Sequence, residues 1–163
     1  MGAAATVAGQ NLGARRPDRA VHGVHVAAGL GLGLAAAIGV LFITIPRSLL
    51  ALFGMTDPVV VGLGVQLLRF LSVSGLFVTV ALTYTGGLQG TGDTRSPLYI
   101  SIVSQIVVPL GLCATLQATR GLHPADIWTA ILLGHMTRCA LSVLRFRQGR
   151  WRSIQVAVEP ARP

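Results

Sequence analysis

Acidic side chains are scarce in this 163-residue chain. It has five Asp and Glu residues, and charged residues of both signs make up 11% of it, whereas a soluble domain carries about 25%. None of the five acids lies in the four long apolar stretches, at 26–45, 70–89, 96–119 and 127–144. The H-E-x-x-H and G-x-S-x-G motifs are absent too, which argues against a membrane protease or hydrolase. We therefore predict no catalytic residues and no enzyme activity.

Lysine is absent, and cysteine is rare. All 13 basic residues are arginine, and the formal net charge is +8. No aromatic residues alternate with these arginines as in RNA-binding segments, so we predict no nucleic-acid partner. Cys113 and Cys139 form no C-x-x-C pair. His22 and His25 share a helix face but have no further ligands near them in the sequence, so we predict no metal site.

Long apolar runs dominate instead. The four stretches contain 18 to 24 residues each, and a helix of about 20 residues crosses a bilayer core about 30 Å thick. We predict an all-α integral membrane protein with a partial N-terminal helix at 1–13, a membrane segment at 14–149 and a tail at 150–163. The four transmembrane helices are expected at about 24–45, 69–89, 97–119 and 125–146.

Proline marks several helix boundaries. Pro17, Pro58 and Pro124 each have the pattern of a residue in a first helical turn. Asp57 is expected to cap the helix that begins at Pro58. Pro109 falls within the third apolar stretch, where it removes one backbone hydrogen bond, and we expect a kink there.

The arginines are unequally divided between the two expected sides of the membrane. The side with both chain ends has nine of them: Arg15, Arg16, Arg19, Arg95, Arg145, Arg147, Arg150, Arg152 and Arg162. The other side has Arg47 and Arg120, with Arg69 near the boundary. The positive-inside rule then places both termini in the cytoplasm of a multi-pass protein. The plasma membrane is the expected location.

The stretch "GLQGTGDT", residues 87–94, has the glycine spacing of a phosphate-binding P-loop. Asp93 stands where the phosphate-binding lysine would be, and a membrane-length helix rather than a β-strand precedes the glycines. We interpret the stretch as a turn between two helices. Gly90 and Gly92 provide backbone freedom, and Asp93 or Thr94 can bond back to the chain.

A few polar residues lie within the apolar stretches. His135 and Arg138 share one face of the last predicted helix, and intramembrane ionisable groups usually face the bundle interior. One interpretation is a transport or coupling role, because histidine changes charge near neutral pH. The other is that His135 bonds to a neighbouring helix and Arg138 reaches toward the cytoplasmic interface. Tyr84 and Gln105 are further candidates to line a cavity.

Two segments resemble signatures of the multidrug and toxic-compound extrusion (MATE) transporters. "GQNLGARRPDRA" at 9–20 is similar to the end of the second helix of a six-helix half, and "GGLQGTGDTRSP" at 86–97 to the connection of the fourth and fifth helices. The basic "RFRQGRW" at 145–151 resembles the stretch after the last helix. The matching motif residues are Gly9, Gln10, Asn11, Gly13, Ala14, Gly90, Gly92, Asp93, Thr94, Arg95 and Pro97.

The resemblance implies a fold of two six-helix lobes. Such a transporter exports drugs or organic cations by antiport with Na⁺ or H⁺, without another cofactor. This chain would correspond to the end of the eighth helix through the twelfth, in the C-terminal lobe. We therefore expect a truncated product that does not transport alone. Its partners would be the lipid bilayer, small organic substrates, and the missing N-terminal lobe or a second copy of the chain.

Two other functions remain open at this point. A lipid or polysaccharide flippase shares the broader fold, although the paired motifs favour the drug exporters. A small four-helix membrane scaffold that acts by association with other proteins also fits the composition.

Overall fold

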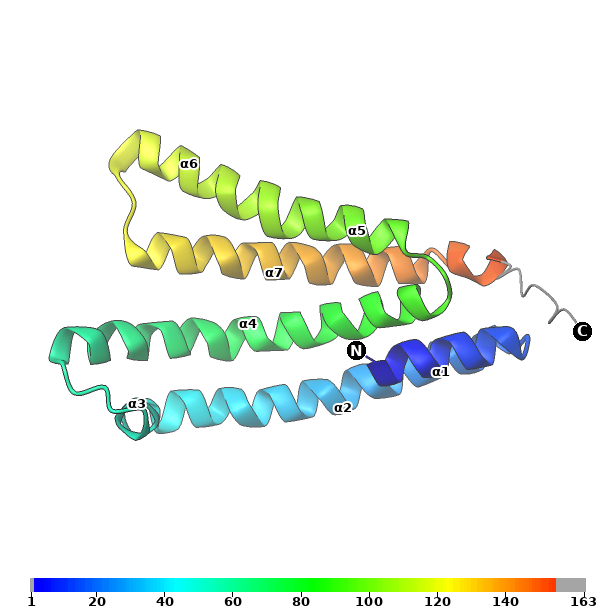
Figure 1. Cartoon of the computed structure of the whole chain (residues 1–163), viewed down its shortest axis with the longest axis horizontal. Helices are drawn as coiled ribbons and strands as arrows, with labels where there is room; N and C mark the ends of the chain where they lie inside the picture. The colour runs from blue at the N-terminus through cyan, green and yellow to red at the C-terminus, as the bar shows by residue number, and fades with distance from the viewer. Residues whose placement is uncertain (1, 155–163) are drawn as a thin grey trace, which may run out of the picture.

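The computed structural model describes residues 2–154, and all regular structure in this range is helical (Figure 1). The helices are α1 (Gly2–Gly13), α2 (Pro17–Thr44), α3 (Pro46–Leu52), α4 (Pro58–Gly90), α5 (Arg95–Ile102), α6 (Val108–Arg120) and α7 (Pro124–Arg147). A π-helical segment, η1 (Val103–Val107), joins α5 directly to α6, and a 3₁₀ turn, η2 (Arg150–Ser153), follows α7. The predicted all-α class is confirmed.

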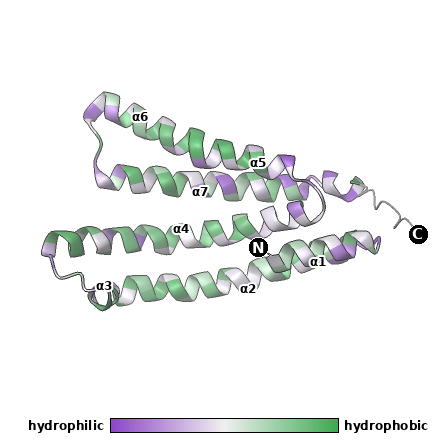
Figure 2. Ribbon diagram, in the orientation of Figure 1, coloured by the Kyte–Doolittle hydropathy of each residue, from purple (hydrophilic) through white to green (hydrophobic). Residues whose placement is uncertain are grey.

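Among the described residues, four helical stretches are long and apolar enough to cross a membrane: α2, α4, the continuous α5–η1–α6, and α7. In Figure 2 the hydrophobic colours dominate these helices, and the hydrophilic colours gather mainly near the ends of the bundle. Large apolar side chains face outward, such as Leu30 at 74% exposed and Leu110 at 63%. A surface so rich in apolar groups suits lipid rather than water. The chain is an all-α, multi-pass membrane protein.

Helix α4 is central in the bundle. It packs against α2 on one side and α7 on the other, while α5, η1 and α6 lie along α7 (Figure 1). Helix α1 packs against both α2 and α4. The turns at 14–16 and 91–94 lie at the same end of the bundle as η2 (Figure 1). We call this end, with residues 13–16, 91–94 and 148–154, the motif end.

Helices α4 and α7 begin at the prolines that the sequence predicts as helix starts, Pro58 and Pro124. The Asp57 carboxylate accepts hydrogen bonds from the backbone N–H groups of Val59 and Val60, at 2.8 and 3.0 Å, as an N-cap does. Helix α7 begins at Pro124, and the Asp126 carboxylate accepts from the backbone N–H of His123 at 3.1 Å. These bonds satisfy donors that a helix start leaves without intrahelical partners.

Glycine permits the closest helix contacts. A β-carbon added at Gly90 of α4 would overlap the backbone of Ala5 in α1. One added at Gly9 would lie 2.6 Å from the Gly90 carbonyl oxygen. Helices in membranes associate through such small residues, since the apolar lipid gives them little hydrophobic drive to associate.

The third membrane stretch is irregular before Pro109. In η1 the Val108 backbone N–H bonds to the Val103 carbonyl, five residues back. Opposite this segment, a β-carbon at Gly134 of α7 would lie 2.5 Å from the Ser104 carbonyl oxygen. The disturbance expected at Pro109 therefore takes the form of a π-helical turn packed closely on α7.

Candidate functional site

Residues 91–94 form a turn between two helices, with Asp93 as its anchor. Asp93 is only 6% exposed. Its carboxylate accepts hydrogen bonds from the Ser96 backbone N–H at 3.1 Å and from the Ser96 hydroxyl at 2.8 Å. The Arg145 guanidinium donates two more, from Nε at 3.1 Å and Nη2 at 2.9 Å. Asp93 thus ties the turn after α4 to the last turns of α7.

Several effects act on the charge of Asp93. Burial by itself would raise the pKa of this carboxyl group. The hydrogen bonds from Ser96 and Arg145, together with the positive charge of Arg145, outweigh burial and hold the pKa below its ordinary value. Asp93 is consequently ionised at neutral pH. The turn gets its conformational freedom from Gly92, whose φ of 92° favours glycine.

A cluster of aromatic rings lies beside this turn. Trp151 of η2 is 1% exposed, stacks on Phe146 with ring centroids 4.9 Å apart, and donates from Nε1 to the Phe146 carbonyl at 2.9 Å. Tyr84 of α4 meets Phe146 edge to face at 5.3 Å, and His25 of α2 meets Tyr84 at 5.8 Å. Of these residues, His25, Tyr84 and Phe146 border an open cleft of about 370 Å³.

Trp151 falls in the segment predicted as the tail, and its packing against Phe146 was not predicted. A signal was available. Gly149 directly follows the last turn of α7, and its positive φ of 70° turns the chain so that Trp151 folds back onto Phe146. A tryptophan two residues after a helix-ending glycine is a candidate for such packing.

The structure brings together two of the four candidate cavity residues. The Gln105 Nε2 of η1 lies 3.5 Å from the His135 Nδ1 of α7, within the half-buried contact of these helices. Arg138 lies further along α7, near its motif end, and lines a different opening from the one beside Tyr84. The candidates therefore fall into three places: a Gln105–His135 pair, the Arg138 cleft and the Tyr84 ring cluster.

The direction of the Gln105–His135 contact depends on the tautomer of the imidazole. In the tautomer whose Nδ1 carries no proton, this nitrogen can accept a hydrogen bond from the Gln105 amide nitrogen, 3.5 Å away. When Nδ1 carries a proton, Gln105 must present its oxygen instead, and its amide has to turn over. The pair can therefore change its arrangement when the imidazole changes its charge.

Among residues 2–154, no group of three or more His, Cys, Asp or Glu side chains is arranged to hold a metal ion.

The comparisons with known proteins agree on one family. The protein-family model described as MatE matches residues 1–115. A probable multidrug resistance protein NorM of Deinococcus radiodurans is 35% identical over 134 residues, which cover 74% of this chain and 30% of that protein. The multidrug resistance protein MdtK of Pectobacterium atrosepticum is 32% identical over 152 residues, which cover 90% of this chain and 33% of that protein. The chain spans about a third of the length of these curated relatives.

Proposed function

The chain belongs to the MatE family, and from this premise we propose that it forms part of a membrane transporter that exports drugs, rather than an enzyme. The observation that carries the proposal is the family match over residues 1–115, which includes both motif segments. The packing supports it, because the glycines of the two segments, Gly9 and Gly90, meet where α1 crosses α4. The names of the relatives favour drug export over the flippase and scaffold alternatives.

The proposal extends to partners and location. We take the substrates to be small organic molecules, cations among them, exported in exchange for Na⁺ or H⁺. The motif end faces the cytoplasm of a plasma-membrane protein, as the nine arginines on that side favour. This chain supplies part of one lobe and requires a further lobe or a second copy, because it spans only about a third of the relatives' length.

The Gln105–His135 pair is the proposed coupling element. It joins η1 to α7 by a polar contact inside a membrane-spanning region, where polar partners are few. Protonation of the imidazole changes which atom of Gln105 can bond to it. A change in the packing of η1 on α7 would then follow the charge of His135. Arg138 stands nearer the membrane edge and is not required for this step.

A chimera tests the proposal. The segment of Deinococcus radiodurans NorM that matches this chain is replaced by this chain, and dye efflux is measured in cells that lack other exporters. We expect efflux from the chimera to vary between about pH 5.5 and 8, the range in which histidine titrates. The His135→Ala chimera should show a flatter profile over the same range.

The control is His22→Ala, which removes an exposed histidine of α2. It should leave the pH profile as it is. A His135→Ala chimera with an unchanged profile would remove the coupling role. A well-expressed chimera without any efflux, beside an active Deinococcus parent, would contradict the assignment of this chain to a drug exporter.

A further inference from the structure

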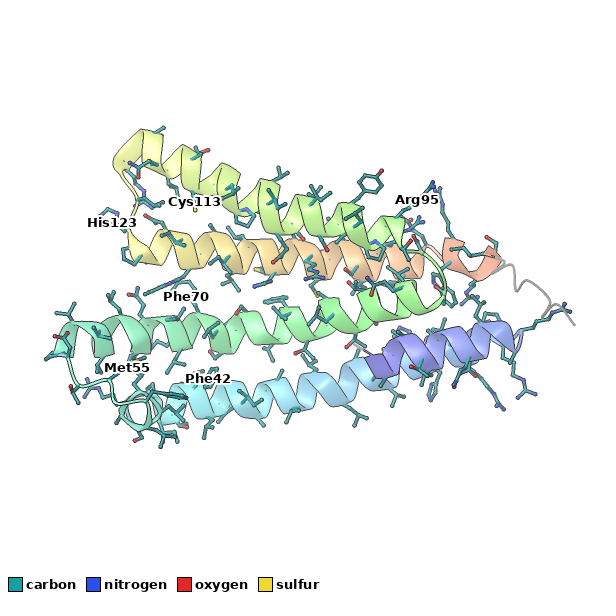
Figure 3. All side chains as sticks on the ribbon, viewed as in Figure 1. Phe42, Met55, Phe70, Arg95, Cys113 and His123 are labelled. Carbon is teal, nitrogen blue, oxygen red and sulfur yellow. The ribbon has the colours of Figure 1, made fainter. Side chains whose placement is uncertain are left out.

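A second cleft at the motif end carries positive charge that no part of the drug-export proposal uses. It has a volume of about 420 Å³ and opens between α4, α5 and α7. Arg95 of α5 and Arg138 of α7 line it, together with Gln89 of α4 and Ser101 of α5. In Figure 3 Arg95 lies at the motif end, at the opposite end of the bundle from His123. Two arginines from different helices thus border one opening.

Neither guanidinium has an anionic partner in the part of the chain that the structure describes. No carboxylate oxygen of residues 2–154 lies within 4.0 Å of Arg95 or Arg138. The carboxylate of this turn, Asp93, is bonded to Ser96 and Arg145 instead. The Nε–H of Arg138 is moreover buried without a hydrogen-bond partner among these residues. Buried donors are seldom left unpaired in proteins, so this nitrogen lacks an acceptor that the described residues do not supply.

The surroundings of the cleft indicate what kind of anion fits. Leu98 lines the cleft and is 58% exposed, and Tyr99 beside it is 66% exposed. Ile102, one turn further along the same helix, is 40% exposed. An apolar strip on α5 therefore leads from the two arginines toward the middle of the membrane-length stretch. A small free anion would contact the arginines but not this apolar strip. An acidic phospholipid would contact both, the arginines through its phosphate and the strip through an acyl chain.

We propose that this cleft binds the phosphate of an anionic phospholipid, with Arg95 and Arg138 on the headgroup and an acyl chain along Leu98 and Ile102. Guanidinium groups bind phosphate oxygens through paired, charge-assisted hydrogen bonds. Basic pockets between membrane helices are suited to acidic headgroups. The Gln89 amide and the Ser101 hydroxyl add neutral donors for the remaining oxygens. The site does not depend on the exported substrate or on the coupling ion.

Lipid retention by the purified full chain tests the site. The chain, in dodecyl maltoside, is mixed with equal amounts of phosphatidylglycerol and phosphatidylcholine, and retained lipids are counted by native mass spectrometry. We expect the unaltered chain to retain phosphatidylglycerol preferentially. Arg138→Gln and Arg95→Gln should each lower this retention about tenfold, the effect of losing one charge-assisted hydrogen-bond pair. Leu98→Gln should lower it as well, by removing the apolar strip.

The matched control is Arg150→Gln, which removes the same charge from an exposed arginine at the same end. It should retain phosphatidylglycerol as the unaltered chain does, and an equal loss in this variant would overturn the site in favour of diffuse attraction. If millimolar inorganic phosphate displaces the lipid and Leu98→Gln has no effect, the cleft binds a free anion rather than a lipid, and the proposal is overturned. Circular dichroism checks folding, and Arg95, an exposed residue, provides the variant least disturbing to the helices. Full retention in folded Arg95→Gln would contradict the proposal.

Discussion

Asp93 stands where a P-loop would have its lysine, and its contacts explain why a carboxylate is required there. Four hydrogen bonds converge on it, two from Ser96 and two from Arg145, which is 52 residues further along the chain. Lysine at this position would face Arg145 with a like charge. The residue therefore joins two helices at the motif end.

The first prediction at this scale concerns the Asp93–Arg145 pair. Asp93→Asn should lower the free energy of unfolding by about 1–3 kcal/mol, because it weakens the bonds to Ser96 and leaves Arg145 without its anion. Thermal unfolding in detergent measures the loss. Adding Arg145→Gln to Asp93→Asn should lower the free energy of unfolding little further, since the Asp93–Arg145 interaction is already broken. Asp18→Asn is the control: its side chain is 91% exposed and its contact with Arg152 is 3.6 Å, so the change should be near zero.

The same carboxyl group predicts a pH dependence. Its pKa in the folded chain lies below the ordinary value of 3.8. The stabilisation it provides is therefore complete above that value and is lost as the pH falls through the lower folded pKa. Unfolding measured from about pH 5 down to 2 should show a decline that is shallower in Asp93→Asn. Parallel curves for the unaltered chain and Asp93→Asn would show that Asp93 does not contribute to the pH dependence of stability.

At the scale of elements, the crossing of α1 and α4 depends on glycine. The chain brings the backbone of Gly90 against that of Ala5, and Gly9 against the Gly90 carbonyl. Two backbones this close leave no room for a side chain. The motif glycines of this crossing thus have a packing role besides any role in the turns.

We predict that Gly90→Ala forces α1 away from α4. Overpacking of this kind lowers the free energy of unfolding by about 1–3 kcal/mol, and hydrogen exchange should become faster at the amides of α1. Gly33→Ala, in α2, is the control because a β-carbon there meets nothing within 4 Å. In that variant stability should stay the same or rise, since alanine favours helix. Unchanged exchange in α1 of Gly90→Ala would contradict the role of the crossing.

For the molecule as a whole, two features bear on the proposed function. The distribution of arginine bears on the orientation in the membrane, and the length of the chain bears on the need for a second body. Four of the nine arginines assigned to the side with the chain ends belong to the motif end, and four more lie within three residues of it along the chain. The first group is Arg15, Arg16, Arg150 and Arg152, the second is Arg19, Arg95, Arg145 and Arg147, and Arg162 lies outside the described residues. The four membrane-length stretches form one bundle around α4. Alternating access needs two bodies that move against each other, and under the drug-export proposal this bundle supplies one of them.

The prediction at this scale uses the chain by itself. Fused after Pro163 to a fluorescent protein that matures only in the cytoplasm, it should give fluorescence at the cell boundary, because the proposed orientation places both termini inside. The same cells should expel dye no faster than cells without the chain. A well-expressed fusion without fluorescence would place the C-terminus outside the cytoplasm and contradict the proposed orientation. Ionophore-sensitive efflux would falsify the requirement for a further lobe or, if crosslinking shows dimers, identify the second copy as that lobe.

The amino-acid order was enough to predict the membrane class, the helix starts at Pro17, Pro58 and Pro124, and the likeness to the family. Each of these depends on signals that act within one helix: an uncharged run about as long as the bilayer is thick, a proline, or a cap such as Asp57. The motif segments likewise need no partner helix to be recognised.

The contacts between side chains of different helices could be found only in the folded chain. It paired Asp93 with Arg145, folded Trp151 onto Phe146, and brought Gln105 rather than Tyr84 to His135. Such contacts depend on the rotation of each helix about its axis, and the π-helical turn η1 alters that rotation for the residues around Gln105. Hydropathy is nearly the same on all sides of a helix buried in lipid, so the sequence alone does not specify which side faces a neighbouring helix.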